Sequence, residues 1–249
     1  THLHGYTNEA EALTAGTLDS HWHLNLDGNW RFCLYQKPAD VEEGCLKPDW
    51  KDSDWDSIKV PGNWTMQGYD SPHYTNVQMP FIHQPPTVPE QNPTGVYRSC
   101  FTLPKGWKER RTVIHFGGVE SAFFVFCNGS QVGFSKDSRT PVEFNLTPWI
   151  VSGKNNLTVV VIRWSDGSFL EDQDHWWMAG IYRDVYLYST DDVFIQDLFA
   201  RGDLDETCTD GQLNIQATIG CVDERLDEYT FEVELYDRDG VKVISLEEP

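Results

Sequence analysis

The feature that most limits the possible folds of this chain is a close succession of short strand patterns between residues 96 and 188. Apolar and β-branched residues alternate with polar ones, and no helical periodicity separates the patterns. Asn128-Gly129 lies between two of them and predicts a tight hairpin, because both residues accept positive φ angles. This spacing favours an all-β fold, either an antiparallel sandwich or a jelly roll. The predicted strands cover residues 96–103, 112–116, 122–127, 131–134, 142–146, 157–164 and 184–188.

Further strand patterns lie on both sides of this region. Trp30, Phe32 and Leu34 alternate with polar residues near the start. After residue 191 the predicted strands are 194–199, 212–219, 230–236 and 241–246, and Asp239-Gly240 joins the last two. Four strands are too few for a complete sandwich, so we expect the second domain to be incomplete.

Charge indicates where the two domains meet. Residues 191–249 contain seventeen acidic and four basic residues, a much stronger excess than in the preceding part. We therefore predict an N-terminal arm over 1–23, a jelly-roll domain over 24–190 and an incomplete sandwich over 191–249. The arm is polar and aperiodic, and we expect it to be ordered only by lying on another part of the protein.

The composition of the 249 residues excludes several classes of partner. The formal net charge of −20 argues against nucleic acid and against an anionic membrane surface. No apolar run reaches the length of a transmembrane helix. The six cysteines are scattered without zinc-ligand spacing, so we expect reduced thiols and a cytoplasmic location. His21 and His23 resemble half a metal site, but without a nearby third ligand a surface or packing role is favoured.

The connection over residues 164–188, WSDGSFLEDQDHWWMAGIYRDVYLY, is rich in carboxylates and indoles. Sugars stack their C–H faces on aromatic rings and bind polar groups through their hydroxyls, so this composition suits a sugar site. An equally weighted alternative is that Arg183 pairs with one of the acids and the tryptophans cover a core edge. The whole chain offers four carboxylates for acid–base work: Asp137, Glu171, Asp172 and Asp174.

A glycosidase needs two carboxylates that face each other about 5–10 Å apart. Glu171 and Asp172 are adjacent in sequence, and such neighbours usually point apart. Asp137 lies between Lys136 and Arg139, so we expect it to stay ionised and to serve as a ligand for sugar hydroxyls or a cation. The alternative for Asp137 is a salt bridge to Arg139.

Residues 68–95 are rich in proline, which rules out a long helix and disfavours central strands. Such a segment is extended and stiff, and it suits a loop that holds a polar group such as Asn76 in a fixed place. A rigid surface wrap explains the same composition, and the residues alone do not decide between the two.

Several motifs occur together in this chain: YTNV at 74–77, NPTG at 92–95, KDSR at 136–139 and LEDQD-x-W at 170–176. They lie in longer matching runs that together cover most of residues 24–188: 24–32, 60–81, 85–101, 118–146 and 163–187. In these motifs the chain resembles the N-terminal part of the glycoside hydrolase family 2 β-galactosidases of the bacterial lacZ type. Residues after 191 resemble the start of that family's immunoglobulin-like domain only weakly.

The resemblance implies a jelly-roll domain, then an immunoglobulin-like domain, and then a TIM barrel that lies outside this chain. It implies hydrolysis of terminal β-D-galactosides with retention, by two barrel glutamates, so that no catalytic residue is expected here. By the same resemblance, Asn76 binds a galactose hydroxyl, and Asp137 contacts the sugar and ligates sodium. Magnesium is expected in the full-length enzyme, bound by residues outside this chain.

Three functional classes follow from these observations. The first is a part of a β-galactosidase that contacts the galactoside substrate, packs against its own barrel and assembles into a homo-oligomer when full length. The second is a stand-alone carbohydrate-binding module without catalysis, against which the incomplete second domain argues. The third is a structural or oligomer-forming domain, against which Asn76 and Asp137 argue because both lie in matching motifs.

Overall fold

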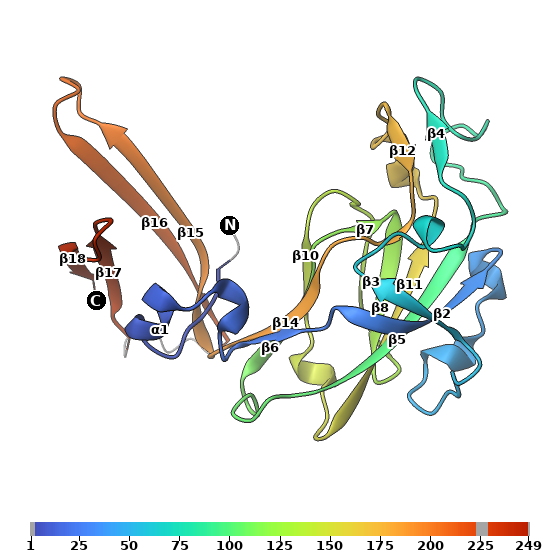
Figure 1. Ribbon diagram of the computed structural model, residues 1–249, viewed down its shortest axis with the longest axis horizontal. Coiled ribbons are helices and arrows are strands. Elements are labelled where there is room, and N and C mark those ends of the chain that lie inside the picture. The colour runs from blue at the N-terminus through green and yellow to red at the C-terminus, as the bar shows by residue number, and fades with distance from the viewer. Residues whose placement is uncertain (1–2, 223–228, 249) are drawn as a thin grey trace. The chain divides into compact units, whose positions relative to one another are not determined.

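The structure, a computed structural model, describes residues 3–222 and 229–248. The chain forms two compact units, one over His4–Ser189 and the other from Thr190 onward. The first unit contains two larger sheets and two short ribbons, and the second contains two-stranded ribbons (Figure 1). Among the described residues, none of the helices is long and apolar enough to cross a membrane.

The larger sheet of the first unit has six strands, and β11 lies inside it with antiparallel partners on both sides. In spatial order its strands are β3 (Asp56–Val60), β2 (Gly28–Tyr35), β5 (Thr94–Thr102), β11 (Lys154–Ile162), β8 (Ala122–Cys127) and β9 (Ser130–Ser135). The smaller sheet consists of β1 (His23–Asn25), β14 (Val185–Thr190), β6 (Arg111–Phe116) and β10 (Val142–Asn145).

The remaining elements of this unit are short. Two ribbons pair β4 (His73–Thr75) with β12 (His175–Trp177), and β7 (Val119–Glu120) with β13 (Gly180–Ile181). The α-helix α1 covers Glu9–Thr14. The 3₁₀ turns are η1 (Thr17–Asp19), η2 (Pro38–Asp40), η3 (Glu43–Leu46), η4 (Trp64–Met66), η5 (Thr147–Trp149) and η6 (Asp166–Phe169).

The two larger sheets pack face to face over one apolar core. Phe116 of the smaller sheet meets Phe123 of the larger one with ring centroids 5.1 Å apart. Tyr97 and Phe32, on neighbouring strands of the larger sheet, lie 4.8 Å apart in the same core. Burying each large apolar side chain contributes roughly 1.5–3 kcal/mol, so this shared core holds the sheets together.

The central strands of the larger sheet are covered on their outer face as well. Val96 and Val160 point away from the main core and pack with Cys45 of η3 in a second cluster. Arg98 is buried on this face, where it pairs with Asp52 at 2.9 Å. Strands covered on both faces lose the alternation of buried and exposed residues, and β5 accordingly buries five consecutive residues from Thr94 to Arg98.

The predicted hairpin at Asn128-Gly129 is confirmed. Asn128 has φ 51° and Gly129 has φ 85°, and the flanking Cys127 and Ser130 pair directly. The Asn128 side chain donates to the carbonyl of Trp149 and to Oδ1 of Asn155, both at 2.8 Å. The turn therefore has the positive φ angles that asparagine and glycine tolerate.

The all-β fold is also confirmed, since each predicted strand has a counterpart with bounds that differ by a few residues. The N-terminal arm contains a helix that its polar composition did not reveal. Helix α1 begins after Asn8, whose Oδ1 accepts from the amide of Glu11 at 2.9 Å. Trp22 packs against the core cluster and holds the end of the arm to the sandwich.

The second unit has four strands in its described residues, as predicted. They are β15 (Val193–Leu204), β16 (Gly211–Cys221), β17 (Phe231–Tyr236) and β18 (Lys242–Glu248). They form two separate antiparallel ribbons, β15 with β16 and β17 with β18. Ile195, Phe199 and Leu213 are exposed on the first ribbon, so the apolar surface of this unit is covered only in part.

We predict that the second unit exchanges its backbone amides faster than the sandwich. Two-stranded ribbons with exposed apolar side chains open more easily than strands buried inside a six-stranded sheet. Hydrogen exchange followed by mass spectrometry should give lower protection for peptides from 193–221 than for peptides from β5 and β11. Equal protection in the two regions would contradict this expectation.

Candidate functional site

The connection between β11 and β14 begins with a rigid turn. Asn92 accepts from the amide of Trp164 at 2.9 Å and donates to its carbonyl at 2.8 Å. The 3₁₀ turn η6 follows, with Ser165 and Ser168 forming a reciprocal cap. Since one buried amide side chain satisfies both backbone groups of Trp164, the start of the connection is fixed against the proline-rich segment.

Asn76 lies immediately after the ribbon formed by β4 and β12. In this ribbon Thr75 is opposite His175, and the Thr75 hydroxyl accepts from Nε1 of Trp177 at 2.7 Å. Asn76 itself is exposed. The ribbon extends beyond the two sheets at one end of the sandwich (Figure 1). The proline-rich segment therefore carries Asn76 at the end of a short paired strand.

Asp137 lies on the loop that follows β9. Its Oδ1 accepts from the amides of Arg139 at 3.0 Å and Thr140 at 3.2 Å, and its Oδ2 accepts from the Thr140 hydroxyl at 2.7 Å. The Thr140 hydroxyl, followed by the Arg139 amide, lowers the pKa of the Asp137 carboxyl. Asp137 is therefore an exposed carboxylate held ionised by its own loop.

The expected alternative, a salt bridge from Asp137 to Arg139, takes a different form in the structure. The backbone amide of Arg139 donates to Asp137, whereas its guanidinium pairs with Glu120 at 3.3 Å. A carboxylate has about four acceptor positions, and Asp137 uses three of them within the loop. These contacts leave one acceptor position, on Oδ2.

Glu171 connects the Asp137 loop to the connection after β11. Its Oε1 accepts from the Ser138 amide at 2.7 Å, and its Oε2 accepts from the Ser138 hydroxyl at 2.6 Å. Tyr182 donates its hydroxyl to the carbonyl of the same serine. Glu171 thus acts as an anchor for the loop, because both of its oxygens are used in holding Ser138.

The other two acids of the connection have separate environments. Asp174 accepts from the Tyr74 hydroxyl at 2.7 Å, which ties β4 to the segment before β12. Asp172 buries Oδ1, which has no hydrogen-bond partner among the described residues. Glu171 and Asp174 therefore shape the connection, Glu171 through the loop contact and Asp174 through the ribbon contact.

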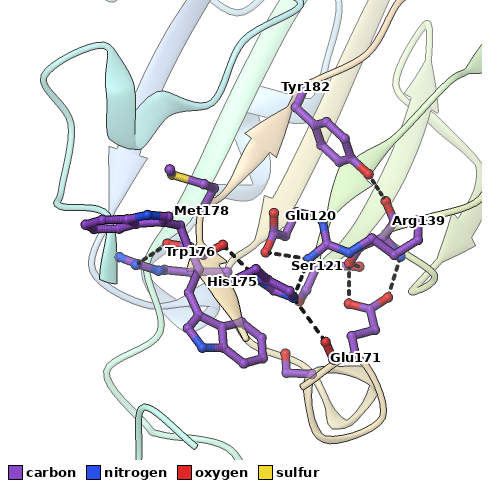
Figure 2. A network of polar contacts seen from close by, with 12 residues as sticks. Glu120, Ser121, Arg139, Glu171, His175, Trp176, Met178 and Tyr182 are labelled. Carbon is purple, nitrogen blue, oxygen red and sulfur yellow. Dashed lines mark hydrogen bonds and ion pairs between the residues drawn. The ribbon is translucent and has the colours of Figure 1, made fainter. Parts of the chain in front are cut away.

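A buried network joins these pieces. Glu120, on β7, is only 4% exposed, and burial raises the pKa of its carboxyl while Arg139 and then His175 oppose the rise. Nη2 of Arg139 lies 3.3 Å from Glu120 and 3.5 Å from Nε2 of His175. Nε2 of His175 also lies 3.2 Å from the carbonyl of Glu171, and Figure 2 shows the four residues linked by these contacts.

Glu120 and His175 were not predicted as site residues. The only local signal was a single carboxylate inside the apolar run GVESAFF at 118–124. A strand position is normally buried or exposed according to its alternation, and a charged residue there is compatible with either. In the fold Glu120 lies opposite Gly180 of β13 and is buried.

The two tryptophans of the connection have different roles. Trp177 is 1% exposed and lies 5.4 Å from Trp164, ring to ring, so it packs inside the fold. Trp176 is 55% exposed and lies 5.4 Å from the ring of Tyr74, which is opposite it in the ribbon. The packing interpretation therefore applies to Trp177, whereas Trp176 presents an aromatic surface on the same ribbon that leads to Asn76.

His21 is exposed and His23 is half-buried, in agreement with the surface or packing role that was favoured. The His21 ring meets Trp22 edge-on at 4.7 Å, and the His23 ring lies 4.7 Å from that of Tyr186. Within residues 3–222 and 229–248, no three His, Cys, Asp or Glu side chains are grouped to hold a metal ion. A cation bound at Asp137 would therefore need further oxygen ligands of another kind or from elsewhere.

Comparison with known proteins now identifies the family. Residues 24–191 match the sugar binding domain of glycosyl hydrolases family 2. The chain belongs to glycosyl hydrolase family 2. The matched region contains Asn76, Asp137 and the connection that joins their loops, so the family's sugar binding domain is the part of the chain in which these contacts lie.

Curated members of this family are similar over most of the chain. A β-galactosidase of Psychromonas ingrahamii is 47% identical over 94% of the chain, and one of Vibrio cholerae is 47% identical over 96% of it. The chain spans 22% and 23% of the lengths of these two proteins.

Solved structures show that the family 2 fold is shared beyond close relatives. A β-glucuronidase of an uncultured Clostridium species superposes with a TM-score of 0.69 at 20% identity, covering 92% of this chain and 39% of that one. A β-glycosidase from Bacteroides vulgatus has a TM-score of 0.67 at 24% identity, covering 90% and 27%. At this level of identity the likeness establishes the fold.

We predict that Thr140→Val raises the pKa of the Asp137 carboxyl toward its ordinary value. The substitution removes the hydroxyl that contributes most to the lowering, and it keeps the volume of the side chain. A carboxyl-carbon NMR titration measures this directly. Asp166, whose pKa is lowered chiefly by Lys136, serves as the internal control and should titrate unchanged. A shift of Asp166 with an unchanged Asp137 would contradict the assignment.

Proposed function

We propose that this chain is the N-terminal part of a β-galactosidase that hydrolyses terminal β-D-galactosides with retention. In this proposal the sandwich contributes substrate contacts and scaffold, and the catalytic glutamates belong to a TIM barrel outside the chain. Support comes from the β-galactosidases to which the chain is 47% identical and from their greater length. The assignment of the two glutamates to a barrel rests on the resemblance in sequence.

The single observation that carries the role of the sandwich is the meeting of two loops. Thr75, next to Asn76, pairs with His175, and His175 in turn contacts Arg139 on the Asp137 loop. An amide and an ionised carboxylate are thereby presented by two segments that are far apart in sequence. Amides and carboxylates are the polar groups that bind sugar hydroxyls, since together they donate and accept hydrogen bonds.

In this proposal Asn76 hydrogen-bonds one galactose hydroxyl, and Asp137 accepts from another. Asp137 also ligates a sodium ion through its remaining acceptor position, with the other oxygen ligands supplied from outside this chain. A monovalent cation there would orient a sugar hydroxyl by direct contact. Magnesium is proposed for the full-length enzyme only, bound by barrel residues.

The proposed partners are the galactoside, the barrel of the same polypeptide and further copies of the full-length protein in a homo-oligomer. We also propose a cytoplasmic location. All six cysteines lie within the described residues and are free thiols, which agrees with a reducing compartment.

A stand-alone carbohydrate-binding module is the second candidate. The exposed pair Tyr74 and Trp176 favours it, because aromatic rings beside Asn76 could stack on a sugar without catalysis. The two candidates differ in whether residues outside this chain are needed for tight sugar binding.

We predict that the 249-residue chain alone does not hydrolyse a chromogenic β-galactoside. Positioned acid and nucleophile account for most of such a rate enhancement, and neither is proposed to lie here. Absorbance of the released chromophore should match a protein-free blank. Turnover that co-purifies with the chain and is lost on Glu171→Gln or Asp174→Asn would place the catalytic groups here and refute the proposal.

We predict that Asp137→Asn in the full-length enzyme lowers kcat/KM about 10- to 100-fold and weakens its dependence on sodium. The change keeps the shape but removes the charge, and a hydrogen bond to a charged group contributes roughly 1.5–3 kcal/mol. Rates measured against sodium concentration, together with Tm, separate this from a structural role. A variant with lower Tm and an unaltered sodium response would contradict the proposal.

A further inference from the structure

We propose that Glu120 is a positioning residue of the sugar site, which acts through Arg139 to hold the Asp137 loop against the ribbon that carries Asn76. This inference rests on the proposed function, because it gives Glu120 a role only if Asn76 and Asp137 bind the sugar. Glu120 lies on a strand of the scaffold and has no role in the substrate contacts proposed above.

The buried position of Glu120 restricts which group can pair with its carboxylate. It lies on β7 opposite Gly180 of β13, and its side chain is 5% exposed. A buried carboxylate without a partner is strongly unfavourable, so the contact with Arg139 at 3.3 Å restricts where the guanidinium can lie. Glu120 is therefore a fixed point that selects one conformation of Arg139.

Arg139 joins three segments at once. Its guanidinium contacts Glu120 and the His175 ring, while its amide donates to Asp137. Its carbonyl accepts from Nη1 of Arg183 at 3.1 Å, on the segment just before β14. Moving Arg139 would consequently shift the amide that holds the Asp137 carboxylate.

The His175 ring completes the connection to Asn76. Its Nδ1 lies 3.0 Å from the carbonyl of Trp176, and its Nε2 lies 3.5 Å from Nη2 of Arg139. The same Nε2 lies 3.2 Å from the carbonyl of Glu171. The backbone of His175 pairs with Thr75, so the ring, the ribbon and Asn76 are joined by a short covalent and hydrogen-bonded path.

Glu171 cannot replace Glu120 in this role. Its two oxygens hold Ser138, which fixes the loop to the connection after β11, but its carboxylate makes no bond to Arg139. The carboxylate of Glu120, by contrast, contacts the guanidinium of Arg139, which also contacts the ring of His175 on β12. Glu171 holds the Ser138 end of the loop and reaches His175 through its own carbonyl, whereas Glu120 holds the Arg139 side chain.

Because Glu120 is buried, its effect on sugar binding can be separated from its effect on the stability of the fold. The titratable groups that face it are Arg139, His175 and Glu171, and burial outweighs the opposing effects of Arg139 and then His175, so the pKa of Glu120 is raised. A raised carboxyl pKa means that the ionised form disfavours folding as pH rises through that value. Glu120→Gln removes this cost and keeps an oxygen for Arg139, so we expect no loss of Tm at neutral pH.

The test uses the complete polypeptide with Glu120→Gln and Glu120→Ala, and it measures the inhibition constant for galactose. We expect the constant to rise about fivefold for Glu120→Gln and further for Glu120→Ala, in the range typical of coupling through neighbouring side chains. Amide exchange of a peptide covering residues 136–141 should speed up in both variants. Glu143→Gln is the matched control, because Glu143 also contacts a histidine and a tyrosine hydroxyl but lies in the smaller sheet.

Three results would overturn the proposal. If Asn76→Ala raises the inhibition constant and both Glu120 variants stay within twofold of the unmodified protein, the sugar site stands and Glu120 does not position it. If Asn76→Ala, Asp137→Asn and the Glu120 variants all leave the constant unchanged, the sugar site itself is wrong and the positioning role fails with it. The third result is a rise in the inhibition constant and a loss of Tm that are as large in Glu143→Gln as in the Glu120 variants.

Discussion

The face-to-face burial of the two sheets is the constraint on which the rest of the first unit depends. Trp30, Phe32 and Tyr97 of the larger sheet and Phe116 of the smaller one share a single core, so neither sheet can slide without exposing large rings. A close-packed core transmits position to the ends of the strands that leave it. The loop after β9 begins from such an end, and its freedom is limited accordingly.

At one end of this sandwich, single side chains each hold two polar groups of another residue. Glu171 takes both the amide and the hydroxyl of Ser138, and Asn92 takes both backbone groups of Trp164. A group whose partners are already in place is preorganised, and ligand binding then spends less free energy on ordering it. The exposed carboxylate of Asp137 and the exposed amide of Asn76 both border this ordered frame.

The second unit is built on a different balance. Its ribbons satisfy their backbone hydrogen bonds within pairs, as β15 with β16 illustrates over eleven registered positions. Apolar residues such as Phe199 and Leu246 nevertheless stay exposed. In the described part of this unit the strands are thus paired, but their apolar side chains are not all buried. Its assignment as the start of an immunoglobulin-like domain stays a prediction.

The sequence by itself determined the strands, the Asn128-Gly129 hairpin and the all-β class, because alternation and turn chemistry are local properties that neighbouring residues decide. Family motifs marked Asn76 and Asp137 for the same reason, since each motif is a short contiguous run. Only the tertiary structure decided that Arg139 pairs with Glu120 and not with Asp137. It also decided that Trp177 is buried while its neighbour Trp176 is exposed. These outcomes depend on which distant segment covers each side chain, and burial of a charge or a ring is a property of the packed fold that no local pattern contains.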